Sequence, residues 1–148
     1  MNRNPYQAPR AHVSDTAEQE KPKAFRIAVV LMWLSFALGM TYGAWDGLSE
    51  LSAEDEGALT VYIVMLVIMG LVFSIPIIFV TLGHNWARWV WLLFFIGGWG
   101  WVFWDWEQSF GTAFDAVIEI FFFLIDLTVI RLLFFGPGAE WFKRARSR

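Results

Sequence analysis

Four long apolar runs constrain this chain more than any other feature of its sequence. They cover residues 25–45, 58–82, 86–104 and 113–135. At about 1.5 Å of rise per helical residue, each run is long enough to cross roughly 30 Å of hydrocarbon. A lone strand inside a bilayer leaves its backbone groups without partners. The runs are therefore predicted to be transmembrane helices.

The amino-acid composition agrees with a membrane protein and excludes several kinds of site. Hydrophobic residues make up 57% of the chain and charged residues 17%, whereas soluble domains are about 45–50% apolar and about 25% charged. The chain has no cysteine, which excludes disulfides, thiolate metal sites and a cysteine nucleophile. Two histidines are too few for a histidine-based metal centre. We therefore expect no metal and no cofactor.

The connections between the apolar runs predict how the helices follow one another. Short segments join 58–82 to 86–104 and 86–104 to 113–135, and short links make consecutive helices antiparallel neighbours. We expect an all-α polytopic membrane protein whose four transmembrane helices form an up-down antiparallel bundle. Pro76 lies inside the second run and removes a backbone donor, so a kink is expected there.

Polar segments flank the predicted helices. Residues 1–23 contain several prolines and show no apolar periodicity, which predicts a disordered cytoplasmic tail. We expect no cleaved leader, so that the first apolar run serves as an uncleaved anchor. The transmembrane domain is predicted over residues 24–135 and a basic interfacial segment over residues 136–148.

Charge predicts the orientation of these helices. All eleven Lys and Arg residues lie near the two ends of the chain, at the start of 86–104 or at the end of 113–135. The two connections on the opposite side carry only acids among their charged residues: Asp46, Glu50, Glu54, Asp55, Glu56, Asp105 and Glu107. Because cytoplasmic segments are enriched in Lys and Arg, both termini are predicted to lie in the cytoplasm.

Three carboxylates in the run 113–135 are the sharpest functional signal. Asp115, Glu119 and Asp126 lie within about 40° of one another around the helix axis. Acids at membrane depth usually face the bundle interior or a water-filled path. One interpretation is a relay for protons or a site for a cation. The alternative is structural: Asp115 forms a capping box with Thr112, and the deeper acids bond to neighbouring helices through Tyr42, Tyr62, Ser35, Thr41, Ser74 or an indole N–H.

Small residues recur in two of the runs. Ser35, Gly39, Gly43 and Gly47 are spaced every four residues, a pattern that lets two helices approach closely, either within the bundle or between copies. Three further glycines occur in the third run beside large indoles: Gly97, Gly98 and Gly100. They offer either a packing surface for those indoles or a place where an aromatic ligand stacks.

The C-terminal segment combines aromatic and basic residues. Residues 139–146 are expected to form a short helix at the cytoplasmic interface. Its aromatic side chains, including Trp141, would enter the headgroup region. The basic residues would meet anionic lipid: Lys143, Arg144, Arg146 and Arg148.

A short motif near the N-terminus carries a resemblance. Residues 4–9 read Asn-Pro-Tyr-Gln-Ala-Pro, followed by a polar linker, four hydrophobic helices and an aromatic, basic end. This layout resembles a loose group of small bacterial four-helix inner-membrane proteins of uncharacterised function, many of which begin with Asn-Pro-Tyr-x-x-Pro. The resemblance implies a bacterial inner membrane as the location. It carries no catalytic residues to this chain.

Two hypotheses for function are consistent with these features. The first is a small membrane protein that acts by contact with another membrane protein, or with itself as a homo-oligomer, in an accessory, modulator or immunity-type role. The second is a small proton- or cation-coupled carrier that uses Glu119 and Asp126. Motifs for hydrolysis or phosphate binding do not occur, so we expect no enzyme. The bilayer is the expected surrounding, and nucleic acid is not an expected partner.

Overall fold

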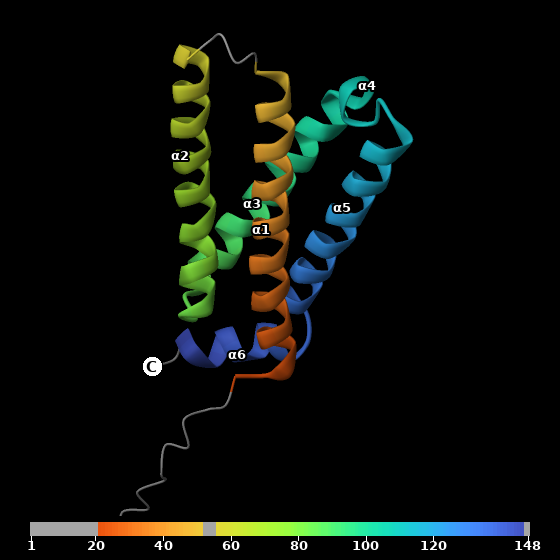
Figure 1. Cartoon of the computed structure of the whole chain (residues 1–148). Helices are drawn as coiled ribbons and strands as arrows, with labels where there is room; N and C mark the ends of the chain where they lie inside the picture. Colours follow the sequence, from red (N-terminus) through yellow and green to blue (C-terminus); the bar gives the residue numbers. More distant parts are fainter. Residues whose placement is uncertain (1–20, 52–55, 147–148) are drawn as a thin grey trace, which may run out of the picture.

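The computed structural model describes residues 21–51 and 56–146, and all regular structure in these ranges is helical (Figure 1). Most of the predicted tail and Arg148 lie outside these ranges. The helices are α1 (Lys23–Glu50), α2 (Glu56–Thr81), α3 (Asn85–Trp104), α4 (Trp106–Ser109), α5 (Ala113–Phe134) and α6 (Pro137–Arg146). The all-α prediction is confirmed, and each of the four apolar runs forms one long helix.

Consecutive long helices run in opposite directions, and α1 has neighbours on two sides (Figure 1). Its most extensive packing is against α5 and its next most extensive is against α2. Helix α2 packs on α3, whereas α3 and α5 meet over a shorter stretch. The short helix α6 lies across one end of the molecule, beside the start of α1.

The buried core is concentrated at the end of the molecule that α6 covers. It combines the start of α1, the ends of α2 and α5, the start of α3, and one residue of α6: Phe25, Ala28, Met32, Ile77, Val80, Ala87, Trp91, Val129, Leu133 and Phe142. Pro76 also lies in this region, fully buried inside α2, and the helix continues past it to Thr81. The large hydrophobic side chains elsewhere are mostly exposed along the long helices.

Local sequence explains three helix termini, which are the end of α2 and both ends of α5. Thr112 accepts the backbone N–H of Asp115, and the Asp115 side chain accepts the backbone N–H of Thr112, so the predicted capping box is present at the start of α5. Gly83 follows α2 with φ of 88°, and Gly136 follows α5 with φ of 68°. This left-handed backbone favours glycine at helix C-termini.

Two helical stretches, Lys23–Ser49 and Gly57–Thr81, are long and apolar enough to cross a membrane. The other two predicted spans form helices of suitable length, but they do not combine high hydropathy with few charged residues as α1 and α2 do. Helix α3 contains Arg88 and many indoles. Helix α5 contains Asp115, Glu119, Asp126 and Arg131. Of the four predicted transmembrane helices, α1 and α2 are thus the two candidate membrane spans among the described residues.

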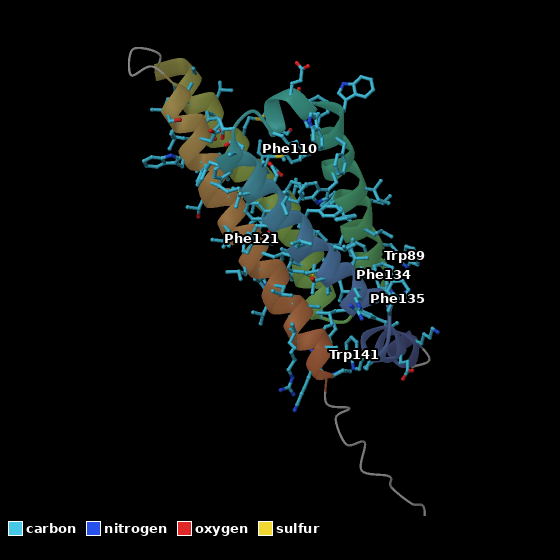
Figure 2. All side chains as sticks on the ribbon, turned by 90° about the vertical axis from the view of Figure 1, so that its right-hand side faces the viewer. Trp89, Phe110, Phe121, Phe134, Phe135 and Trp141 are labelled. Carbon is cyan, nitrogen blue, oxygen red and sulfur yellow. The ribbon has the colours of Figure 1, made fainter. Side chains whose placement is uncertain are left out.

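Helix α6 differs from the expected interfacial anchor because its aromatic side chains turn inward. Phe142 is fully buried, and its ring centroid lies 5.6 Å from that of Phe25 in α1. Trp141 lies 4.6 Å from Phe25, and Figure 2 shows it beside the start of α1. Phe142 of α6 therefore completes the core, and Trp141 packs against it.

The same end of the molecule holds a buried cation. Arg88 is 9% exposed and its Nη1 donates to the carbonyl oxygen of Leu133 at 3.2 Å. Its guanidinium carbon lies 5.0 Å from the ring centroids of both Phe134 and Phe142. Such cation–π contacts stabilise a charge that has left water. Arg88 consequently ties α3 to α5 and α6.

The contact between Gly83 and Trp141 allows a test of the docked position of α6. A Cβ atom on Gly83 would overlap the Trp141 ring, whereas one on Gly136 would meet nothing within 4 Å. Both glycines have positive φ, so each Gly→Ala change costs about 1–2 kcal/mol in the backbone. We expect Gly83→Ala to lower the thermal unfolding midpoint in detergent more than Gly136→Ala. Equal midpoints would contradict the docked position of α6.

Candidate functional site

A partly open cavity of about 640 Å³ lies between α1, α2, α3 and α5, on the side of the core that faces away from α6. Its walls are mostly apolar and aromatic, with glycines from α1 and α3: Ser35, Phe36, Gly39, Met40, Gly43, Leu66, Met69, Phe73, Trp91, Leu93, Phe94, Phe95, Gly97, Gly98, Trp99, Val102 and Asp126. Cavities of roughly 300–1,000 Å³ accommodate small organic ligands. Among these lining residues, Asp126 is the only ionisable one.

Asp126 is held by hydrogen bonds from two other helices. Ser35 Oγ in α1 donates to Oδ1 at 3.2 Å, and Trp99 Nε1 in α3 donates to Oδ2 at 3.3 Å. Both donors are buried, whereas Asp126 is half-buried. A carboxylate offers about four acceptor positions, so acceptor capacity is left for a ligand. No Lys or Arg among the described residues forms an ion pair with Asp126.

The glycines explain why this part of the bundle is hollow. A Cβ atom added to Gly39, Gly43, Gly97 or Gly98 would meet no atom within 4 Å. A glycine face lets two helix backbones approach closely, but only where a neighbouring helix lies against that face. Here the glycines line the cavity, so no described neighbouring helix packs against the open faces of Gly39 and Gly43.

Gly47 behaves differently from the other glycines of α1. A Cβ atom on Gly47 would overlap the Tyr62 ring of α2. The Tyr62 hydroxyl also donates a hydrogen bond to the carbonyl oxygen of Gly43. The close approach suggested by the small residues therefore occurs at Gly47, within the chain and against α2.

The remaining acids of α5 also face α1 but do not line the cavity. Asp115 Oδ1 accepts a hydrogen bond from the Tyr42 hydroxyl at 3.3 Å, in addition to its bonds in the capping box. Glu119 is half-buried one turn further along. The structure thus separates the three predicted acids: Asp115 is a helix cap, Asp126 lines the cavity, and Glu119 lies between them.

The hydroxyl partners predicted for these acids divide into two groups. Ser35 bonds to Asp126 as predicted, whereas Tyr42 bonds to Asp115 and not to one of the deeper acids. The others bond to backbone carbonyl oxygens, which are Ala37 for Thr41, Gly43 for Tyr62 and Leu71 for Ser74. The indole partner is Trp99, which the sequence could not single out from ten tryptophans.

Aromatic rings form a continuous wall beside Asp126. The Trp99 ring lies 4.9 Å from Phe123 and 6.4 Å from Phe95, centroid to centroid. Phe95 and Phe123 stack at 5.9 Å, and Phe94 lies 4.8 Å from Phe73 of α2. Such ring pairs stabilise one another and fix the indole that donates to Asp126.

Neither a protein-family model, nor a curated protein, nor a solved structure matches this chain. Its function is therefore inferred from the residues themselves.

Two tryptophans of α3 provide a matched test of the Asp126 site. Trp91 and Trp99 are both 8% exposed, but only Trp99 donates to Asp126, and the indole N–H of Trp91 has no acceptor among the described residues. We expect Trp99→Phe to be more destabilising than Trp91→Phe by about 1 kcal/mol in detergent unfolding, because one change breaks an interhelical hydrogen bond and the other removes an unpaired donor. The reverse order would contradict the assigned partners.

Proposed function

We propose that this chain is a multi-pass membrane protein and that it acts as a small proton- or cation-coupled carrier through Asp126. In this proposal α1, α2, α3 and α5 cross a bacterial inner membrane, with both termini in the cytoplasm. The observation that carries the functional part is the Asp126 carboxylate, which lines a cavity formed by four helices and has no cationic partner among the described residues.

The exposed surfaces of α3 and α5 support the placement of these two helices in the membrane. The acids of α5 turn toward α1 and α3, and the exposed Arg131 lies in the last turn of the helix. The other exposed large residues are apolar: Phe114, Val117, Ile120, Phe121, Leu124, Leu127 and Phe135 just beyond its end. In α3 the charge of Arg88 is buried. Soluble monomers rarely expose contiguous apolar surface on this scale. A bilayer would cover the outer faces of α3 and α5. These faces are more apolar than each helix as a whole, because most of the charged residues turn inward.

The acid in the cavity supports a role with cations. Burying an unneutralised carboxylate away from water is costly, and a purely structural network would need no cavity beside it. A group that exchanges a proton or a cation can be neutral in one state and charged in another. Contact with a partner protein, the other hypothesis, makes no use of an ionisable group that lines a cavity.

The absence of cysteine permits a direct test of topology. Single cysteines would be placed at exposed positions Ser49 before the first acidic connection, Glu107 in α4, and Lys143 in α6. We expect an impermeant maleimide to label Ser49→Cys and Glu107→Cys in intact spheroplasts, and Lys143→Cys only after permeabilisation. If α1 and α2 were the only spans, Glu107→Cys would also require permeabilisation.

Flux measurements in proteoliposomes test the carrier proposal. With a pH or cation gradient, we expect Asp126→Asn to reduce flux to that of empty vesicles. The reason is that an amide carries no charge and cannot take up or release a proton. Glu119→Gln, an equivalent change on the same helix outside the cavity, is expected to keep flux. Both variants should retain the wild-type elution profile in detergent.

Two results would contradict the carrier proposal. One is flux that is absent from the wild-type protein under all gradients. The other is a foreign membrane protein that copurifies in a fixed ratio from native membranes together with full biological activity of Asp126→Asn. The second result would favour the contact hypothesis instead.

A further inference from the structure

We infer that the cavity beside Asp126 binds a lipophilic organic monocation, with Asp126 as its counter-ion and the aromatic wall as its contact surface. This inference rests on the proposed function and names the ligand class of the same site. Four observations support it: the charge of the lining, its chemistry, its volume and its open side.

The charge of the lining favours a single positive charge. Asp126 is the one ionisable group among the described lining residues, and its two bonded donors, Ser35 and Trp99, are neutral. An inorganic divalent ion is bound by several oxygen ligands, typically six or more for Ca²⁺. The described residues hold no cluster of three or more metal-ligating side chains. One carboxylate therefore suits a monocation.

The chemistry of the walls favours an organic cation over a hydrated inorganic one. Hydrated ions require several oxygen ligands to replace their water, and Ser35 is the only other polar side chain besides the indoles in the lining. Rings of tryptophan and phenylalanine attract a diffuse positive charge through their faces. The two lining methionines, Met40 and Met69, adapt to irregular apolar shapes.

The volume and the open side favour a ligand that reaches the cavity from the apolar part of a membrane. About 640 Å³ exceeds what one small ion needs and suits a drug-sized molecule. The exposed members of the lining all belong to α2 or α3: Met69, Leu93, Gly97 and Gly98. The mouth therefore lies between these two helices, on the surface that the proposal places in lipid, where a lipophilic cation concentrates.

The test measures binding of tetraphenylphosphonium to the full chain in lipid nanodiscs, by equilibrium dialysis with empty nanodiscs as the blank. Tetraphenylborate serves as a probe of nearly the same shape and opposite charge. We expect saturable binding of one tetraphenylphosphonium per chain, which Asp126→Asn weakens roughly tenfold or more. Glu119→Gln, which makes the same acid-to-amide change outside the cavity, should bind as the wild type does.

A second variant tests the cavity without altering charge. Gly39→Leu places a side chain in open space, since nothing lies within 4 Å of an added Cβ. It should fold normally and block tetraphenylphosphonium by filling the site. The inference is overturned if tetraphenylborate binds as tightly as tetraphenylphosphonium. It is also overturned if neither Asp126→Asn nor Gly39→Leu weakens binding, which would indicate partitioning into lipid only.

Comparing tetraphenylphosphonium binding with cation flux distinguishes failure of this inference from failure of the carrier proposal. Flux of protons or small cations that depends on Asp126, without saturable tetraphenylphosphonium binding, overturns the ligand class and leaves the carrier proposal standing. Binding that depends on Asp126, without flux of any cation, supports the ligand class and overturns transport.

Discussion

The carboxylate of Asp126 joins α5 to α1 and α3 beside the cavity. Its two oxygens accept from Ser35 in α1 and from Trp99 in α3. Helices in a lipid surrounding gain little from hydrophobic burial against one another. In the proposed membrane setting, interhelical hydrogen bonds and close packing would therefore decide which faces meet. Helix α5 packs most extensively on α1, and its other two acids face the same neighbour.

The two ends of the molecule use different physical means to stay together. At the end covered by α6, the core is dense and aromatic, and Arg88 is stabilised by rings and by the carbonyl oxygen of Leu133. Toward the other end, glycines and a half-buried acid leave a cavity. The four long helices thus meet in one core, and the cavity lies beyond it between the same helices.

Part of the candidate site could be predicted from the sequence. The helical period places Asp115, Glu119 and Asp126 on one stripe, and the capping box at Thr112 follows from local chemistry. The role of Trp99 could not be predicted, since helical spacing does not say which indole of one helix meets which acid of another. The inward turn of Phe142 in α6 could not be predicted either, because an amphipathic segment suits a lipid interface and a protein surface equally well.

The number of the long helices, the asymmetry of charge and the shared face of the acids follow from the sequence alone, because they depend on local composition and on one helical period. The limits follow to within two residues except at the end of α1, which continues five residues past the predicted run to Glu50. The packing of the helices decided that Gly39 and Gly43 line a cavity while Gly47 contacts Tyr62. It also decided which acid lines that cavity. The physical reason is that a gap between helices depends on how all four diverge above a common core, a property that no single segment carries.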